Sequence, residues 1–493
     1  MVCTFPITFP IMPFLKFDKH MIQGRQWAQL AGPLIALMVY LIAPQFGWSE
    51  SAVSVLAASS WMLVWWISEA VPIAVTSILP IVLFPLFGIS SVGETTAPYG
   101  SHYVFLFMGG FLVAIALENW NLHRRFALNI LSAAGGSPRR LIGGFMLATA
   151  LLSMWISNTA TTLMMLPIAL SVISKLELKK HPNFAVALLL GTAYSANIGG
   201  MATLVGTPPN VALAGIMEEQ YGVVIPFMEW MLLASPFSAI LLFLVYVLLT
   251  RVLLPISKET VGEGLKPLRN ELNALGGWSM AEKRVGLVFG TTALLWISRR
   301  FIEGWTGWSL NDTTIAMAAG ISLFLIPSGE QGRSLMSWTE AKRLPWEILL
   351  LFGGGLTLAG ALGRAGILEV IANALSEQGG WPLWMMVAAF AFVALMLTEV
   401  MSNLALTVVM VPVVAQVALQ LGLNPLTLAV PVALASSCAF MLPMATPPNA
   451  IIFGSNKIRM GQMARVGIVL NLIAAILAVV WSAFVLPVWL EML

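Results

Sequence analysis

Two short peptide patterns each occur twice in this chain, and their side chains are of the types that hold small ions. Residues 157–160 read Ser-Asn-Thr-Ala and residues 402–405 read Ser-Asn-Leu-Ala, and a Thr-Pro-Pro-Asn run follows each of them, at 207–210 and 446–449. Hydroxyl, amide and carbonyl oxygens are the ligands that hard cations prefer. The N–H groups at the start of a helix attract anions. The patterns therefore predict a duplicated anion site that is accompanied by cations.

The composition indicates that these patterns lie inside a membrane. Apolar residues make up 59% of the chain and charged residues 10%, with a mean hydropathy of +0.89, which describes a protein whose solvent is mostly lipid. Apolar runs of about 20 residues, the length that crosses about 30 Å of hydrocarbon, recur from residue 28 onward. The two cysteines, Cys3 and Cys438, are too few for a disulfide framework or a thiolate metal site. We predict an all-α polytopic membrane protein surrounded by the lipid bilayer.

The apolar segments beside the first Ser-Asn pair are too short to cross a bilayer. Residues 141–156 and 160–174 form two arms of roughly 15 residues, and each arm reaches about 24 Å at about 1.5 Å per residue. Basic residues bound both outer ends, so both ends lie on one side. We predict a re-entrant hairpin over about 139–175 and a second over about 384–420. Backbone without partners at such a tip is tolerated only where it lines a polar cavity or is covered by protein.

The Thr-Pro-Pro-Asn runs interrupt two otherwise ordinary helices, which we predict over about 184–217 and 426–456. Proline lacks an N–H and its ring clashes with the preceding turn, so each Pro-Pro pair unwinds its helix. A single proline is usually only a kink, but two matched pairs beside Thr and Asn favour a polar break that serves a site. No Lys or Arg lies close to the tips or the breaks. Helix dipoles and hydrogen bonds are therefore expected to hold the anion, and bound cations to supply the positive charge.

The chain divides at its only long polar stretch, which is predicted to be a cytoplasmic linker over 255–283. The two halves, 28–254 and 284–493, carry Trp-Ile-Ser, Gly-Gly, Ser-Asn and Thr-Pro-Pro-Asn landmarks in the same order and at nearly constant spacing. Coincidence in an apolar sequence of low complexity does not account for this agreement. Each half contributes an odd number of crossings, so the two copies have opposite orientations. This is the inverted repeat expected of transporter halves that meet around a site near the midplane.

Basic residues predict the orientation, because Lys and Arg accumulate in cytoplasmic loops. With a cytoplasmic N-terminus, all 25 Lys and Arg residues except Arg299, Arg300 and Arg364 fall on the cytoplasmic side. The C-terminus is then expected outside. Residues 1–27 are interpreted as an interfacial segment, because their lysines follow the apolar stretch, which is the wrong order for a signal peptide. The short loops favour a bacterial inner membrane.

These motifs resemble those of a known family, the divalent-anion:sodium symporters, also called the sodium-dependent dicarboxylate and sulfate transporters. The resemblance covers almost the whole chain. It includes the paired Ser-Asn elements, the run Trp-Trp-Ile-Ser-Glu-Ala at 65–70 that leads to Pro72, and a sodium:sulfate signature from Ser437 to Asn449. It implies about 11 transmembrane helices plus the two hairpins, arranged as inverted repeats in a homodimer. A mobile transport domain would carry substrate and sodium past a static scaffold by an elevator motion.

The resemblance also implies which residues bind ions and substrate. One sodium site is implied at Ser153, Ser157, Asn158 and Gly206, and a second at Thr398, Ser402, Asn403 and Ala445. The positions implied for the substrate are Asn158, Thr159, Thr207, Ser402, Asn403, Leu404, Thr446 and Pro447. Sodium is therefore the expected coupling ion and a small dicarboxylate or related anion the expected substrate. No organic cofactor is implied.

Leu404 departs from the family pattern, because the bacterial dicarboxylate carriers used for comparison have Thr at this position. The leucine removes one hydroxyl from the second tip, and it either tunes the choice of substrate or packs against the scaffold. Succinate, malate and fumarate are the implied substrates, with 2-oxoglutarate, citrate and sulfate as alternatives. A dicarboxylate exchanger that is not driven by a net sodium gradient is the main alternative mechanism, because the same motifs serve both.

Other classes of protein find no support in the sequence. Neither His-Glu-x-x-His nor Gly-x-Ser-x-Gly occurs and a Walker A pattern is absent, so an enzyme is not expected. A passive channel would be excluded by flux that saturates and depends on a counter-ion, and no nucleic acid is expected as a partner. Glu69 and Glu399 lie in apolar surroundings, where an ionisable residue is a functional candidate. The resemblance suggests that they instead brace loops or hairpins.

Overall fold

The computed structural model describes residues 19–135, 137–175, 183–256, 266–307, 310–376 and 381–493. In these residues the chain is helical almost throughout, and a single isolated bridge between Pro327 and Ser334 is their only β-type pairing. Nine of the described helices are long and apolar enough to cross a membrane. The predicted all-helical, polytopic membrane class is confirmed. Most of the interfacial segment predicted over 1–27, and part of the linker predicted over 255–283, lie outside the described residues.

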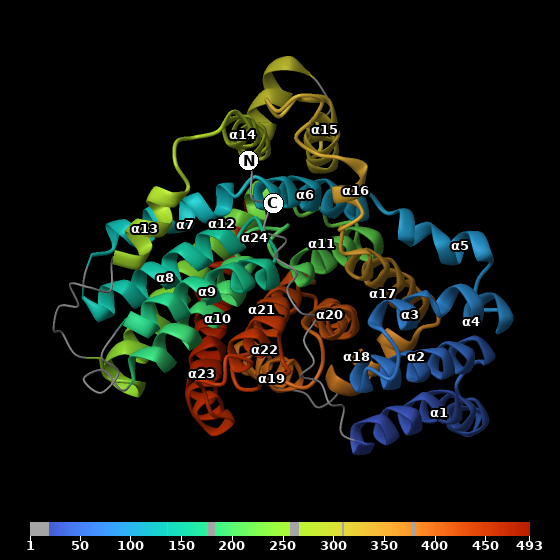
Figure 1. Ribbon diagram of the computed structural model, residues 1–493. Helices are drawn as coiled ribbons and strands as arrows, with labels where there is room; N and C mark the ends of the chain where they lie inside the picture. Colours follow the sequence, from blue (N-terminus) through green and yellow to red (C-terminus); the bar gives the residue numbers. More distant parts are fainter. Residues whose placement is uncertain (1–18, 136, 176–182, 257–265, 308–309, 377–380) are drawn as a thin grey trace.

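The elements of the first part of the chain are α1 (Lys19–Ile42), η1 (Ala43–Phe46), α2 (Glu50–Ser68), α3 (Ile73–Ile78), α4 (Pro80–Leu86), α5 (Val92–Thr96), η2 (Ala97–Gly100), α6 (His102–Asn119) and α7 (Leu122–Ala133). This part runs from one side of the molecule, where α1–α5 lie, past α6 near the middle to α7 toward the opposite side (Figure 1). Helices α1 and α2 pack side by side, and α3 packs on the later helix α17 (Trp346–Arg364). Pro80 is the first residue of α4. The N–H at this position of a helix has no hydrogen-bond partner within the helix, so a proline here costs no hydrogen bond. The chain therefore divides into two short helices here rather than one span.

Two helical hairpins carry the Ser-Asn pairs at their tips. They are α8 (Pro138–Ser153) with α9 (Asn158–Lys175), and α19 (Leu383–Leu397) with α20 (Asn403–Gln420). Each second arm begins at the asparagine and contains one proline, Pro167 or Pro412, at the same distance from its start. The proline interrupts the helical hydrogen bonding but leaves the apolar arm continuous. The first arm of the first hairpin begins with Pro138 behind a serine cap.

Two interrupted helices cross the middle of the molecule. The first comprises α10 (Phe184–Met201) and α11 (Pro208–Tyr221), and the second α21 (Leu426–Ser436) and α22 (Pro447–Phe453). Every residue of α10 is buried. A helix that is apolar on all sides belongs in a core rather than on a lipid-facing surface. Each Pro-Pro pair opens the second part of its helix, so the breaks lie where the prolines predict them.

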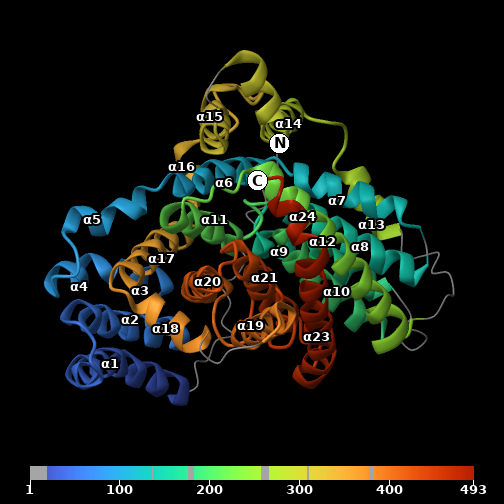
Figure 2. The ribbon, with the colours of Figure 1, turned by 180° about the vertical axis from the view of Figure 1, so that it is seen from behind.

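The hairpins and interrupted helices pack in a reciprocal arrangement. Helices α8 and α9 pack on α10, while α19 and α20 pack on α21. In addition α9 contacts α22 and α11 contacts α20, so each hairpin reaches the interrupted helix that follows the other. Figures 1 and 2 show α20 and α21 near the centre of the molecule from both sides. Segments about half the chain apart therefore meet in one place.

The remaining helices surround this centre. They are α12 (Phe227–Val247), the π-helical η3 (Leu248–Leu253), α13 (Lys266–Ala274), α14 (Met280–Thr306), α15 (Asp312–Leu325), α16 (Trp338–Ala341), α18 (Ile367–Ser376), α23 (Met460–Phe484) and α24 (Leu486–Leu490). Helices α14 and α15 extend away from the other helices (Figure 2). Large apolar side chains such as Phe301, Trp305 and Leu325 are exposed on them. Such surfaces suit contact with lipid rather than water.

Small residues set the close approach of several helices. A Cβ atom at Gly109 would overlap Ala316 across the contact between α6 and α15, and one at Gly354 would overlap the Ser77 carbonyl between α17 and α3. Helices in lipid gain stability chiefly from close van der Waals contact, which small residues permit. The two glycines therefore bring the first and second halves of the chain into backbone contact.

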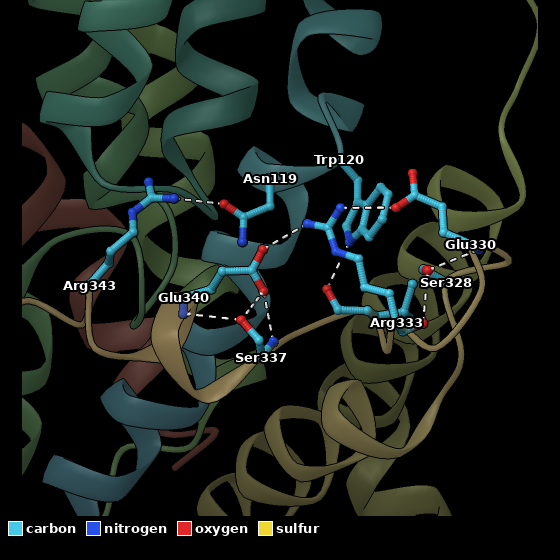
Figure 3. Close-up of polar contacts among 9 residues, drawn as sticks. Asn119, Trp120, Ser328, Glu330, Arg333, Ser337, Glu340 and Arg343 are labelled. Carbon is cyan, nitrogen blue, oxygen red and sulfur yellow. Dashed lines mark hydrogen bonds and ion pairs between the residues drawn. The ribbon is translucent and has the colours of Figure 1, made fainter. Parts of the chain in front are cut away.

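A polar cluster also joins the two halves at the corner between α6 and α7 (Figure 3). Trp120 Nε1 donates to the Leu335 carbonyl at 2.7 Å, and the Arg333 guanidinium lies 4.5 Å from the Trp120 ring centroid. Arg333 pairs with Glu330 at 3.0 Å and with Glu340 at 2.9 Å. The cluster connects the loop between α15 and α16 to the C-terminal end of α6. The two halves of the chain are therefore in contact at this corner.

Glu340→Ala is expected to destabilise this corner by about 1–2 kcal/mol, because Glu340 pairs with Arg333 and completes the capping box at Ser337. Burial raises the pKa of the Glu340 carboxyl, but hydrogen bonds from Ser337 and Arg333 outweigh it, and the pKa lies below its usual range. The stabilisation is therefore complete above the usual pKa of about 4.3 and is lost as pH falls through the lowered pKa. Thermal unfolding in detergent, followed by circular dichroism at several pH values, checks both points.

The matched control is Glu330→Ala. Glu330 is the more exposed partner of Arg333, and an exposed pair contributes about 0–1 kcal/mol. Equal losses of stability in the two variants would contradict the assigned role of Glu340.

Candidate functional site

The first hairpin tip holds its asparagine between the two arms. The Ser157 hydroxyl accepts a hydrogen bond from the Ala160 N–H at 3.2 Å, which caps the start of α9. The buried Ser153 hydroxyl, from the end of α8, donates to Asn158 Oδ1 at 2.7 Å. The Asn158 side chain is therefore fixed across the tip rather than free to turn.

The second tip repeats this geometry with one addition. Ser402 caps α20 by accepting from the Ala405 N–H at 3.2 Å. The Thr398 hydroxyl lies 2.7 Å from Asn403 Oδ1 and 2.6 Å from the Ser436 carbonyl oxygen. One hydroxyl proton serves only one of these acceptors at a time. Thr398 Oγ1, Asn403 Oδ1 and the Ser436 carbonyl oxygen thus have one hydroxyl proton among them. Together these oxygens form a suitable set of ligands for a cation.

The asparagines of the Thr-Pro-Pro-Asn runs hold the helix breaks together. Asn210 Nδ2 lies within hydrogen-bond distance of the carbonyl oxygens of Gly200, Met201 and Thr203, at 3.2, 3.1 and 2.7 Å. Asn449 Nδ2 does the same with Ala439 and Leu442, at 3.0 and 3.1 Å. Both asparagines are fully buried. They satisfy carbonyls that the interrupted helices leave without partners.

Oxygen atoms also gather beside the first break. A Cβ atom at Gly206 would lie 2.5 Å from the Gly200 carbonyl oxygen and 3.0 Å from that of Met154, and one at Gly200 would lie 2.5 Å from Asn158 Oδ1. Uncharged oxygens of this kind suit a hard cation. The described residues contain no group of three or more His, Cys, Asp or Glu able to hold a metal ion. The donor sets at both tips therefore fit an alkali cation better than a transition metal.

The two tips and the two breaks line one cavity of about 320 Å³. Ligand pockets commonly measure about 300–1,000 Å³, so a small organic ion is of suitable size. All predicted site residues except Ser153 and Thr398 line it, namely Ser157, Asn158, Thr159, Gly206, Thr207, Ser402, Asn403, Leu404, Ala445, Thr446 and Pro447. Ser153 and Thr398 contact the asparagine side chains instead.

Several lining residues lie outside the sequence motifs. Asn197 in α10 donates to the Thr446 hydroxyl at 3.1 Å and so links one helix break to the other. Its position in an otherwise apolar helix, just before Gly199, is a signal that the sequence contained. The others are Ile73, Phe111, Glu347, Ile348 and Leu351. Those from α3, α6 and α17 carry no local pattern, because their position depends on packing between the halves.

Thr159 and Leu404 occupy the matching position of the two tips, and both line the cavity. Leu404 is only 5% exposed. It therefore makes apolar contacts within the protein as well as facing the cavity, so its two predicted roles, tuning and packing, are compatible with each other.

Glu399 braces the second break. Its carboxylate accepts hydrogen bonds from the backbone N–H groups of Phe440, Met441 and Leu442, each at 2.9 Å, and from Asn471 Nδ2 at 2.8 Å. A carboxylate that is buried in a membrane protein needs such charge-assisted hydrogen bonds. These contacts support the bracing interpretation over a direct role in binding.

Polar contacts outside the cavity join α6, α11, α12, α14 and α15. Tyr103 donates to Glu218 at 2.7 Å, Arg300 pairs with Glu229 at 2.7 Å, and the Phe227 N–H donates to Asp312 at 2.8 Å. Glu218 lies ten residues after the start of α11, which is about 15 Å along the helix. The lining residues Ile73, Glu347 and Ile348 come from the first turns of α3 and α17.

Fold and site together define a polytopic membrane protein with a central cavity lined by hairpin tips and interrupted helices. Residues 24–492 match the family described as the sodium:sulfate symporter transmembrane region. The chain therefore belongs to this family, whose members are transporters rather than enzymes.

The curated relatives are similar over nearly their whole length. The sodium-dependent dicarboxylate transporter SdcS of Staphylococcus saprophyticus is 40% identical over 489 residues, which cover 96% of this chain and 93% of the relative. The protein of the same name from Staphylococcus aureus is 39% identical over 485 residues, with the same coverage.

Two solved structures share the fold. The YdaH transporter of Alcanivorax borkumensis superposes with a TM-score of 0.55 at 13% identity, over 81% of this chain and 87% of the other. MtrF of Neisseria gonorrhoeae gives a TM-score of 0.56 at 12% identity, over 82% and 83%. At these identities the likeness concerns the fold alone.

Proposed function

We propose that the protein is a secondary transporter that couples the movement of sodium ions to that of a dicarboxylate. The observation that carries the proposal is the single cavity between two matching tips, each with an asparagine held by a hydroxyl. No Lys or Arg is among the described lining residues. A dianion in this cavity therefore depends on bound cations for its counter-charge. Relatives about 40% identical are named sodium-dependent dicarboxylate transporters.

In this proposal sodium is bound behind the substrate at both tips. Ser153, Ser157, Asn158 and Gly206 hold one ion, and Thr398, Ser402, Asn403 and Ala445 hold the other. The cluster of three oxygens that share one proton at the second tip supports this assignment. The sodium ions would supply positive charge that leaves together with the substrate. No fixed cationic side chain then holds the substrate in the cavity.

The substrate would lie between the tips and be held through its two carboxylates. Asn158, Thr159 and Thr207 serve one carboxylate, and Ser402, Asn403, Thr446 and Pro447 the other, with Leu404 beside it. The starts of α9 and α20 would point N–H groups and positive dipole ends toward the same space, and α11, which begins with two prolines, would add its dipole end. The cavity size and the two matched ends favour a C4 acid such as succinate, malate or fumarate.

The reciprocal packing supports two inverted repeats, because a two-fold axis that exchanges the halves would convert the α9–α22 contact into the α20–α11 contact. We place the hairpins, α10–α12 and α19–α23 in a mobile transport domain, and the other spans in a scaffold that dimerises. The cavity then faces the cytoplasm, where the loops carry basic residues. Bacterial relatives suggest an inner membrane, with the N-terminus inside and the C-terminus outside.

The test is uptake of radiolabelled succinate into proteoliposomes that contain the purified protein. An inward sodium gradient is compared with an equimolar choline gradient, with and without internal succinate. Sodium-dependent uptake into vesicles without internal succinate is expected. Uptake that requires internal succinate would favour an exchanger, and no uptake under either condition would point to sulfate, 2-oxoglutarate or citrate.

Leu404→Thr should change the ranking of substrates while transport continues, because it restores a hydroxyl at the cavity wall. One added hydrogen bond to a carboxylate is worth about 1.5–3 kcal/mol, so relative affinities should shift by roughly tenfold or more. Competition of unlabelled succinate, malate, citrate and sulfate against labelled substrate measures the ranking. An unchanged ranking would leave packing as the role of Leu404.

A further inference from the structure

Glu347 is the one ionisable residue among the described residues that line the central cavity. It lies in the first turn of α17 and is exposed. The structure gives its carboxylate no hydrogen bond or ion pair with any described residue. Arg343, one turn earlier in the chain, pairs instead with Glu118 at 3.2 Å and donates to Asn119 at 2.6 Å. No described cation therefore neutralises Glu347.

Glu347 lies where the cavity opens to the surface, because Glu347 and Pro447 are the two exposed residues among the described residues that line it. Helices α3 and α17 pack together, with Gly354 against Ser77, and their first turns contribute the lining residues Ile73 and Glu347. Deeper in the protein, Gly215 of α11 packs against the buried Phe352 of α17. An ion that leaves through the open end passes the Glu347 carboxylate.

A free carboxylate at this place acts oppositely on the two proposed cargo ions. It repels a dianion and attracts sodium, and apolar cavity walls of low dielectric strengthen such a field. On the same two helices, α3 and α17, the apolar residues Ile73, Ile348 and Leu351 also line the cavity. The effect reaches about 8 Å at physiological ionic strength before salt screens it.

We propose that Glu347 is an electrostatic selector at the mouth of the cavity, where it weakens binding of the anionic substrate and strengthens binding of sodium. The proposal rests on the proposed sodium-coupled transport of a dicarboxylate. Release of the dianion to this side is faster as a result, while sodium concentrates near its sites. Glu347 acts on ions in the cavity and is not one of the residues that hold them.

The competing explanation is structural, because an acidic residue in the first turn of a helix stabilises it through the dipole. A purely structural residue, once replaced, would lower stability and weaken both ions together. An electrostatic selector moves the two affinities in opposite directions, and salt removes the difference. The two explanations therefore predict changes of opposite sign in the affinity for the substrate when Glu347 is replaced.

The experiment compares wild type, Glu347→Gln and the control Glu50→Gln in detergent, using the full chain. Glu50 is likewise exposed in the first turn of its helix, α2, but does not line the cavity. Equilibrium binding of radiolabelled succinate with sodium, and of ²²Na without succinate, is measured at total ionic strengths of about 0.1 M and about 1 M, where the Debye length is about 10 Å and about 3 Å. Thermal midpoints are recorded in parallel.

At low ionic strength, Glu347→Gln is expected to bind succinate roughly threefold to tenfold more tightly and sodium roughly twofold more weakly. Both differences should shrink at high ionic strength, and Glu50→Gln should match wild type. Unchanged affinities, or a parallel loss of both with a lower thermal midpoint, would overturn the role of Glu347. If wild type fails to bind succinate while Glu347→Gln still weakens sodium binding, the substrate assignment fails and the role of Glu347 stands.

Discussion

Asn158→Ala and Asn403→Ala are each expected to reduce sodium-driven uptake of succinate by at least about a hundredfold. Each asparagine is positioned at a hairpin tip by a hydroxyl at 2.7 Å, and each side chain is proposed to contact both a sodium ion and the substrate. Hydrogen bonds to charged groups are worth about 1.5–3 kcal/mol each. Loss of two such contacts corresponds to about 3–6 kcal/mol, and about 1.4 kcal/mol is a factor of ten.

Initial uptake rates in proteoliposomes measure this effect, with thermal midpoints in detergent to show that the variants fold. Asn129→Ala is the matched control, because Asn129 is exposed on α7 and only donates to the carbonyl of Arg125 in its own helix. Near-normal uptake by either tip variant, once folded, would refute the duplicated site. Loss at only one tip would show that the two copies are not equivalent.

Gly206→Ala is expected to weaken the apparent affinity for sodium by roughly tenfold to a hundredfold. The added Cβ would lie 2.5 Å from the Gly200 carbonyl oxygen and 3.0 Å from that of Met154, so these carbonyls must move. Overpacking of this kind costs about 1–3 kcal/mol. The change tests sterics, because Gly206 is not among the glycines with a positive φ and its backbone suits alanine.

The sodium dependence of uptake provides the measurement, and Gly290→Ala provides the control, because nothing lies within 4 Å of a Cβ atom built at Gly290 in α14. The corresponding position of the second site is already alanine, Ala445. The second proposed sodium site therefore has a Cβ atom at this position, whereas the carbonyls around Gly206 leave no room for one in the first site. Unaltered sodium dependence in Gly206→Ala would place the first ion elsewhere.

Much of the local structure follows from residues that act on their own neighbourhood. The Pro-Pro pairs begin α11 and α22, because the fixed φ and missing N–H of proline suit the first positions of a helix and prevent its continuation from the preceding turn. Ser157 and Ser402 begin α9 and α20, since a serine hydroxyl caps the first free N–H groups of a helix. These effects span only a few residues, which is why the breaks and tips could be predicted from the sequence.

Other features depend on which helices meet, and the sequence carries no local signal for them. Phe111 and Leu351 line the cavity only because α6 and α17 pack beside the hairpins. Trp120 contacts Arg333 although the polar linker separates their halves of the chain. The bracing of the second break by Glu399 required the backbone N–H groups of 440–442 to turn toward it, and Met154 at the matching position of the first tip has no carboxylate.

The sequence by itself determined the membrane class, the two interruptions, the two hairpin tips and the side chains placed there, because composition and the chemistry of Pro, Ser and Asn act over short distances. Only the tertiary structure decided that both tips and both breaks share one cavity, that Asn197 joins Thr446, and that Glu347 stands at the open end. Such contacts join segments far apart in the chain, and they arise from the close packing of whole helices.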